Sequence, residues 1–362
     1  MKTLPSNRKS FSFRAPQESF RAVPWVDQNP PKKILAIRLQ AIGDTIITLP
    51  YLQSLHNVLP TTSFHFLTRA ESGDLPRNLS MFDRVHTVDG GRSAVRQWGS
   101  AMLLVPRLRA EHYDIVIDLQ RNHLSRALRQ ILQPKSFSEF DRFSPKSAGE
   151  RTASTIEALR LPPLEHTPAE ILLRDDNYGL EQLHLAGYDP EKKLIVLNPA
   201  GSFVTRNWPI ENYYQFASGW MKNVDERVQF LMLGLGAVRE KASYLQKKLG
   251  AHFLNLVGKT SISGAFNILR KTHLVLSEDS GLMHLAWVAR VPVVALFGST
   301  KSVWSKPLGE RSVCLDSSDL QCGECLQPEC QFGDVRCLTR YDSLFVINVS
   351  RKLLEKVSQS GS

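Results

Sequence analysis

The arrangement of short apolar runs along the chain constrains the fold most strongly. Four such runs alternate with amphipathic stretches in the first half of the chain, and the same rhythm returns in the second half. The runs are residues 34–38, 64–67, 84–88 and 114–118, followed by 194–198, 229–233, 274–277 and 293–297. Strands that alternate with helices form parallel sheets with helices on both faces. The sequence therefore predicts an α/β protein with two Rossmann-like domains.

The length of the chain and this pattern divide it into five segments. One hydrophobic core rarely serves more than ~250–300 residues, and this chain has 362, so two cores are expected. The less regular stretch between the two sets of alternating apolar runs is interpreted as a hinge. We predict a tail at 1–32, a first domain at 33–175, a hinge at 176–192, a second domain at 193–340, and a C-terminal helix with its own tail at 341–362.

The beginning of the chain carries much of its positive charge. The formal net charge is +10, and seven Lys or Arg against two acids in residues 1–33 supply half of it. The Ser and Pro content of this segment predicts a disordered tail, which is either solvated or in contact with anionic lipid. No apolar run approaches the ~20 residues of a membrane helix, and no signal-peptide core is present, so a soluble, cytoplasmic chain is expected.

Polar residues follow three of the predicted strands, where helices are expected to begin. Gly43 and Asp44 follow the first run of the first domain, and Arg206 follows the first run of the second. The stretch SEDSGLMHLA (277–286) follows the third run of the second domain. Helix N-termini in open α/β sheets bind phosphorylated ligands through their unpaired N–H groups. Taken alone, Asp44 could be only a helix cap and Arg206 only a surface charge.

The order of several motifs along the chain resembles a known family. The strings are IRLQAIGDTIITLP, DLQRNHLSRAL, LNPAGSFVTRNWP, GLGAVRE, GKTS and SEDSGLMHLAWVARVPVVALFGST. Together they resemble glycosyltransferase family 9, the lipopolysaccharide heptosyltransferases, over about residues 33 to 340. The resemblance implies a GT-B fold, in which two Rossmann-like domains face each other across a cleft. It implies acceptor binding by the first domain, nucleotide-sugar binding by the second, and inverting transfer of heptose from ADP-heptose to the inner core of lipopolysaccharide.

Two residues are predicted to be catalytic. An inverting displacement needs a base for the attacking hydroxyl, and Asp44 at a helix N-terminus suits that role. It also needs a positive charge for the departing diphosphate, and Arg206 suits that one. The family position of Arg206 usually holds Lys, so this chain replaces a point charge with a planar guanidinium.

The resemblance also predicts a donor site. Asp279 matches a residue that reads sugar hydroxyls, Glu240 one that accepts from the ribose, and His284 could donate to the diphosphate. The simpler interpretations are a first-turn carboxylate for Glu240 and a core histidine for His284. The predicted donor-binding residues are Gly43, Ser202, Glu240, Asp279, Ser280, Gly281 and His284.

Acceptor contacts are predicted in the first domain. Arg121, Arg126 and Arg129 follow the run at 114–118, where an anionic glycolipid acceptor would lie. A solvated helix face explains these three arginines about as well. The expected partners are a nucleotide-sugar donor and this acceptor, with peripheral membrane contact and no nucleic acid.

Metal chemistry is not expected at the reacting centre, since Asp175 and Asp176 adjoin and form no Asp-x-Asp pair. No cofactor is expected to be required. Four cysteines nevertheless fall close together as CGEC-x4-C-x6-C: Cys322, Cys325, Cys330 and Cys337. This spacing could hold a structural zinc ion, form disulfides, or leave packed thiols.

Two alternatives to the heptosyltransferase interpretation stay open at this point. One keeps the fold and the chemistry but changes the nucleotide sugar or the acceptor, because nothing around Glu240 distinguishes the nucleotide base. The other is a non-catalytic module that binds a sugar nucleotide, in which Asp44 only caps its helix.

Overall fold

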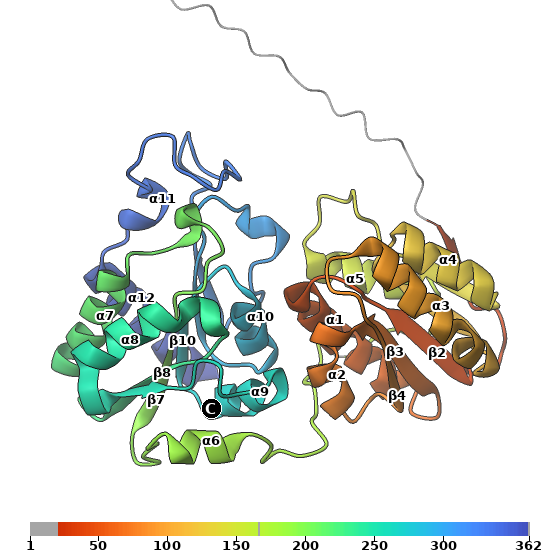
Figure 1. Ribbon diagram of the computed structural model, residues 1–362, viewed down its shortest axis with the longest axis horizontal. Coiled ribbons are helices and arrows are strands. Elements are labelled where there is room, and N and C mark those ends of the chain that lie inside the picture. The colour runs from red at the N-terminus through yellow and green to blue at the C-terminus, as the bar shows by residue number, and fades with distance from the viewer. Residues whose placement is uncertain (1–20, 166, 361–362) are drawn as a thin grey trace, which may run out of the picture.

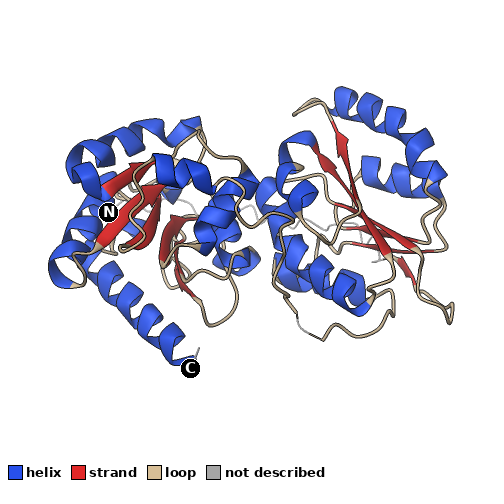
Figure 2. Cartoon of the chain, turned by 90° about the horizontal axis from the view of Figure 1, so that it is seen from below, coloured by secondary structure: helices blue, strands red, loops and turns tan. Residues whose placement is uncertain are grey.

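Two parallel sheets, each with helices on both faces, make up the computed structural model, which describes residues 21–165 and 167–360 (Figure 1). Seen from below, the two sheets lie side by side with helices between them (Figure 2). Within the described ranges, no helix has both the length and the apolar character needed to cross a membrane.

The first sheet contains all four strands predicted in the first half of the chain. Its order is β1-β6-β5-β2-β3-β4, and every pair is parallel except β1 with β6. The strands are β1 (Ala22–Val23), β2 (Lys33–Ile37), β3 (Ser63–Arg69), β4 (Arg84–Val88), β5 (Ile115–Asp118) and β6 (Ser136–Glu139). The sequence analysis missed β1 and β6, because β1 has two residues and β6 alternates with polar side chains.

Strand β1 corrects the predicted extent of the tail. Ala22 pairs with Ser138 and Val23 with Phe137, and the N–H of Trp25 donates to the carbonyl of Leu159 at 2.8 Å. The chain therefore joins the first sheet well before residue 33. Residues 1–20, which carry the rest of the predicted tail, lie outside the described part of the chain.

Helices cover the first sheet on both faces. Helices α1 (Ile42–Val58) and α5 (Ala148–Glu157) pack on one face, and α3 (Ala94–Ala110) and α4 (His123–Leu132) pack together on the other. Short helical segments η1 (Ala70–Ser72) and α2 (Asp74–Asn78) follow β3.

The second sheet repeats this architecture, and it too contains all four predicted strands. Its order is β12-β11-β10-β7-β8-β9, with every pair parallel. The strands are β7 (Lys193–Asn198), β8 (Val228–Met232), β9 (Phe253–Asn255), β10 (Leu274–Glu278), β11 (Val293–Leu296) and β12 (Ser312–Leu315). The sequence analysis missed the two edge strands β9 and β12, which have three and four residues.

The helices of the second half follow the same alternation. They are α7 (Ile210–Asn223), α8 (Arg239–Leu249), α9 (Ile262–Arg270), α10 (Gly281–Val288), α11 (Arg336–Thr339) and α12 (Ser343–Ser360). Short 3-10 turns occur at η2 (Val204–Arg206), η3 (Gly236–Val238), η4 (Gly250–His252) and η5 (Ser302–Trp304). Helix α12 packs against α7, so the end of the chain rests on the second domain.

The two domains share one apolar core at their junction. Helix α1 of the first domain packs along α10 of the second, and one cluster of buried apolar side chains includes residues of both. The segment between the sheets contains α6 (Leu180–Leu185), which packs on α9. Because α1 follows β2 and α10 follows β10, the carboxyl ends of two central strands lead to the same junction.

Candidate active site

Asp44 lies in the first turn of α1, at the junction of the domains. Its Oδ2 accepts a hydrogen bond from the N–H of Ala41 at 3.1 Å, so the carboxylate caps its own helix. The same oxygen lies 3.0 Å from Nη2 of Arg38. The Asp44 side chain is nevertheless 41 % exposed, which leaves carboxylate surface open to a ligand. Asp44 therefore acts as a cap and remains accessible from outside, and its role as a base stays a prediction.

Two arginines that the sequence analysis did not select lie beside Asp44. Arg38 and Arg151 sit over the ring of Phe140, with their Cζ atoms 5.0 and 5.1 Å from its centre. Burial, and then the charge of Arg38, lowers the pKa of Arg151, while the charge of Asp44 opposes this shift. The only sequence signal was the position of Arg38 at the end of its apolar run.

His284 lies on α10, between the acids of the two domains. It is buried, and burial lowers the pKa of its imidazole while the negative charges of Asp279 and Asp44 raise it. A methyl group at Gly43 would come within 2.8 Å of the His284 Cδ2 atom, so the helices meet closely here. Among the described residues, nothing forms a hydrogen bond with the buried His284 Nδ1. The role of His284 in donor binding stays a prediction.

Arg206 and Asp279 form the wall of the site in the second domain. Nη1 of Arg206 lies 3.5 Å from Oδ2 of Asp279, and the guanidinium also stacks over the ring of Phe203 at 5.2 Å. Asp279 is only 9 % exposed. The buried Nε of Arg206 has no hydrogen-bond partner within the described part of the chain. The charge predicted to meet a diphosphate thus lies beside the acid predicted to read the sugar.

The loop that carries Arg206 is packed closely against the end of the second sheet. A Cβ atom at Gly201 would lie 2.2 Å from the carbonyl oxygen of Arg206, and one at Gly298 would lie 1.9 Å from that of Thr205. Only glycine fits at either position without moving backbone. The hydroxyl of Thr205 also bonds Ser299 at 2.9 Å, which fixes the loop to the segment after β11.

Glu278, at the end of β10, anchors both ends of this loop and was missed by the sequence analysis. Its carboxylate accepts hydrogen bonds from the N–H of Gly201 at 2.6 Å and of Trp208 at 2.7 Å. Its side chain is fully buried, and this burial raises the pKa of Glu278 to about 7, against the opposing charge of Lys241. The sequence shows Glu278 beside Asp279 in the SEDSG motif. The groups that donate hydrogen bonds to Glu278, however, lie about 70 residues earlier in the chain.

We expect Glu278 to make the stability of the protein depend on pH. Between pH 4.5 and about 7, the native protein holds a proton on Glu278 that the unfolded chain releases. The free energy of unfolding should therefore fall as pH rises through this window, by on the order of 3 kcal/mol, and level off above it. Urea denaturation at several pH values should show this fall in the wild type, and Glu278→Gln should remove it. Glu191→Gln, at an exposed carboxylate, is the control, and equal slopes for all three proteins would contradict the prediction.

The remaining predicted donor residues occupy three different settings. Ser280 precedes α10, and its hydroxyl accepts a hydrogen bond from Nδ2 of Asn198 at 2.7 Å. Gly281 is the first residue of α10, and a Cβ there would meet only Ile42, at 4.0 Å. Ser202 is exposed on the Arg206 loop, and Glu240 is exposed in the first turn of α8. Their roles in donor binding stay predictions.

Side chains of both domains also line one small cavity at the junction. Ile47 and Gly149 come from the first domain, and His284, Trp287 and Trp304 come from the second. A ligand that reached His284 from this side would therefore touch both domains.

Comparisons with known proteins point to one family. A family model described as glycosyltransferase family 9 (heptosyltransferase) matches residues 163–336. Lipopolysaccharide heptosyltransferase 1 of Pseudomonas aeruginosa is 26% identical over 324 residues, which cover 83% of this chain and 88% of that protein. Residues 163–336 belong to glycosyltransferase family 9.

Solved structures show the GT-B fold of this family 9 chain. The glycosyl transferase family 9 protein of Veillonella parvula aligns with a TM-score of 0.77 at 18% identity, over 90% of this chain and 97% of that one. The ADP-heptose lipopolysaccharide heptosyltransferase II of Escherichia coli aligns with a TM-score of 0.71 at 18% identity, over 90% and 99%. The fold and the family predicted from the sequence are thus confirmed.

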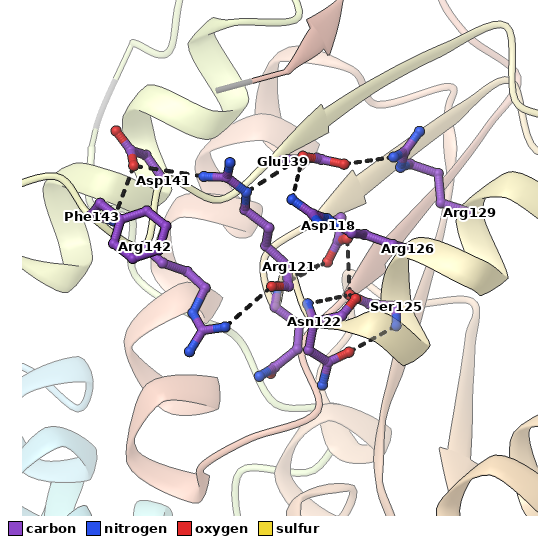
Figure 3. A network of polar contacts seen from close by, with 11 residues as sticks. Asp118, Arg121, Asn122, Ser125, Arg126, Arg129, Glu139, Asp141, Arg142 and Phe143 are labelled. Carbon is purple, nitrogen blue, oxygen red and sulfur yellow. Dashed lines mark hydrogen bonds and ion pairs between the residues drawn. The ribbon is translucent and has the colours of Figure 1, made fainter. Parts of the chain in front are cut away.

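Two of the three predicted acceptor arginines of this chain are buried, which the sequence did not suggest. Arg121 and Arg129 are 3 % and 8 % exposed, so they form neither an open acceptor site nor a solvated helix face. Figure 3 shows them turned toward Glu139, at 3.5 Å from Nε of Arg121 and 2.6 Å from Nη2 of Arg129. Arg126 approaches the same carboxylate at 3.7 Å and keeps 26% of its side chain exposed.

The physical reason for this correction is a buried acid that sequence reasoning did not consider. Glu139 ends β6 and is 1 % exposed, and an unpaired charge at such a depth would cost several kcal/mol. Beside it, Asp118 accepts hydrogen bonds from the N–H groups of Gln120 and Arg121 and from the Ser125 hydroxyl (Figure 3). Arg121 and the two arginines of α4 therefore neutralise Glu139 at the end of β6.

The predicted cysteine cluster of the family 9 chain surrounds a single cavity of about 230 Å³, which Thr205 and Ser299 also line. All five cysteines are free thiols, so the disulfide alternative is wrong for this structure. No three His, Cys, Asp or Glu side chains in the described ranges are arranged so that they could hold a metal ion. The zinc site at Cys322, Cys325, Cys330 and Cys337 stays a prediction from spacing alone.

Proposed function

We propose that this protein transfers a heptose from ADP-heptose to the inner-core oligosaccharide of lipopolysaccharide, with inversion at the anomeric carbon and without a metal ion. We further propose that it works in the cytoplasm, in peripheral contact with the membrane that holds the acceptor. Membership of family 9 supports the glycosyl transfer. The names of the Pseudomonas and Escherichia coli relatives support heptose and ADP-heptose as the sugar and the donor.

The observation that carries the proposal is that Asp44 and the pair of Arg206 and Asp279 both lie near His284 at the domain junction. Asp44 comes from the first domain, and Arg206 with Asp279 comes from the second. His284 lies close to both Asp44 and Asp279, because the negative charges of these two residues both act to raise its pKa. A base for the attacking hydroxyl and a cation for the leaving diphosphate, one from each domain, are the two groups that a single displacement between bound substrates needs.

The reaction can be written with these side chains in defined roles. A hydroxyl of the acceptor attacks the anomeric carbon, and its proton passes to the carboxylate of Asp44 as the new bond forms. The bond between this carbon and the diphosphate oxygen breaks, and its electron pair leaves with the diphosphate. Attack and departure on opposite faces invert the anomeric centre.

Positively charged and N–H groups of the protein would stabilise the negative charge that develops on the leaving diphosphate. Arg206 supplies a cation whose Nε has no hydrogen-bond partner among the described residues. The first N–H groups of α10 add a partial positive charge, and His284 Nδ1 can add a further polar contact. Such preoriented groups stabilise the leaving oxygen more strongly than water does.

Arginines near Asp44 suit an acidic acceptor. Arg38 is already engaged with Asp44, whereas Arg151 is half-buried in the same place and is influenced by the charge of Asp44. Arg126 is the predicted acceptor residue that keeps an exposed part. We propose Arg151 and Arg126 as contacts for carboxylate or phosphate groups of the acceptor.

Ligand-induced stabilisation tests the proposed donor. A nucleotide that binds only the native state raises the free energy of unfolding by RT ln(1 + [L]/Kd). In a thermal-shift panel, ADP should raise the Tm more than UDP, GDP or CDP at equal concentration, and ADP-heptose should then support transfer to a truncated core acceptor. A larger rise in Tm with another nucleotide would support a different donor. If no nucleotide changed the Tm, the result would contradict both the ADP-heptose donor and an alternative nucleotide-sugar donor.

A further inference from the structure

The solvent-facing side of α3 is apolar. Val95 and Leu103 are 81% and 84% exposed, and Trp98 and Met102 lie between them at 37% and 36%. The opposite side of the helix is buried through Gln97, Ala101 and Leu108. Positions 95, 98, 102 and 103 have the i, i+3, i+7, i+8 spacing of one helix face. Helix α3 therefore presents apolar side chains both to the core and to the outside.

A surface helix normally has a single apolar stripe, with charged residues on the side that faces water. A contiguous apolar patch on the surface of a soluble domain marks a place where something binds. The outer face of α3, defined here as Val95, Trp98, Met102 and Leu103, is such a patch.

The charges within the segment that carries the outer face of α3 are all positive. Arg92, Arg96, Arg107 and Arg109 lie along residues 90–110, which contain no Asp or Glu. Two acids flank this segment: Asp89, which is exposed, and Glu111, which is bound by Lys33 at 2.7 Å and by Arg84. An apolar face on a helix whose charges are all cations complements a surface that is apolar inside and anionic at its boundary.

The position of α3 leaves the candidate active site free. Its buried side belongs to a core cluster made only of residues between 35 and 132, whereas the core shared with the second domain lies on the other face of the sheet. Figure 1 shows α3 next to α4, apart from the junction where α1 meets the second domain. A large object could cover the outer face of α3 without blocking the junction.

We propose that the outer face of α3 docks onto a lipid bilayer that carries anionic headgroups. Aliphatic side chains enter the boundary between headgroups and acyl chains, and tryptophan prefers this boundary because its ring is apolar and its N–H is polar. Each arginine near an anionic membrane adds to the attraction, which salt weakens. The proposal rests on the proposed function in one respect, since a lipid-linked acceptor gives the docking its purpose.

Vesicle co-sedimentation of the full chain tests this surface. Wild-type protein should bind vesicles of phosphatidylcholine with phosphatidylglycerol, bind phosphatidylcholine vesicles much less, and lose affinity in high salt. Val95→Ser/Leu103→Ser should lower the partition coefficient at least about tenfold, and Arg96→Gln/Arg107→Gln by a similar factor on anionic vesicles only. Leu344→Ser/Arg351→Gln changes an exposed apolar residue and an exposed arginine on α12 and should bind as the wild type does.

A second readout keeps the result independent of the basic tail. Tryptophan fluorescence should shift to the blue when anionic vesicles are added, and Trp98→Phe should lose most of this shift. Unchanged vesicle binding by Val95→Ser/Leu103→Ser would overturn the proposal, because the tail or another surface would then carry the affinity. Absence of binding by the wild type would also overturn it and point to a protein partner.

The same variants separate this inference from the proposed function. Val95→Ser/Leu103→Ser should transfer sugar to a soluble truncated acceptor at the wild-type rate but act more slowly on an acceptor embedded in anionic vesicles. If no variant and no wild-type protein transfers heptose at all, the proposed function fails while vesicle binding still decides the role of α3.

Discussion

Asp44→Asn should lower turnover at least about 100-fold while the fold and the affinity for ADP stay unchanged. Asparagine caps a helix about as well as aspartate, so the bond from the Ala41 N–H can persist. The amide cannot accept the proton of the attacking hydroxyl, and general base catalysis typically contributes ~10²–10⁴-fold. Steady-state transfer kinetics, thermal unfolding and ADP binding measured on the same preparation check the three parts of this prediction.

The capping role needs its own control. Glu150 occupies the same position in α5 that Asp44 has in α1, and its Oε2 accepts the N–H of Ser147 at 2.8 Å. Glu150→Gln should therefore show what a weakened cap does to stability and turnover. If Glu150→Gln lost as much turnover as Asp44→Asn, or if Asp44→Asn kept near-normal turnover, Asp44 would not be the base.

Arg206→Ala should lower kcat by a factor of about 100 to 1000, which corresponds to the ~2.7–4 kcal/mol lost with one oxyanion donor in other enzymes. Charge on the leaving oxygen grows toward the transition state, so the loss should fall mainly on kcat rather than on donor KM. Arg206→Lys should recover most of the rate, because it restores the positive charge. Steady-state kinetics of both variants give the comparison.

Loss of Arg206 also leaves Asp279 without its partner, and this effect must be separated. Asp279 is 9 % exposed, so an unpaired charge there could destabilise the loop without any catalytic role of Arg206. Arg206→Ala/Asp279→Asn should restore stability without restoring kcat. Arg227→Ala, at an exposed arginine of the same domain, should leave both unchanged. A wild-type kcat in Arg206→Ala would contradict the proposed role of Arg206 in stabilising the leaving diphosphate.

The sequence predicted best where the signal is local. A buried parallel strand is a continuous apolar run, so all eight predicted strands are present, whereas β1 and β9 are too short to form a pattern. Gly43, Asp44 and Arg206 could be selected as candidates because a helix or turn begins beside each of them. The fold of each half therefore followed from apolar runs and the turns between them.

The parts that failed depend on partners distant in the chain. Arg121 and Arg129 were interpreted as accessible cations because Glu139 gives no sign in the sequence that it will be buried between them. Glu278 was passed over because its two hydrogen-bond donors come from a different loop. Arg38 and Arg151 come together only through the ring of Phe140.

The contact between Gly43 and His284 has a consequence for how this enzyme could change. In the proposed arrangement each domain binds its own substrate, so acceptor preference and donor preference can change through substitutions in different domains. Neither domain alone sets the distance between the attacking and leaving oxygens, because this distance depends on how closely α1 approaches α10. A side chain larger than hydrogen at position 43 would meet the His284 ring at 2.8 Å and push the domains apart. We expect chimaeras that exchange whole halves to tolerate new substrates more readily than they tolerate any change at this one position.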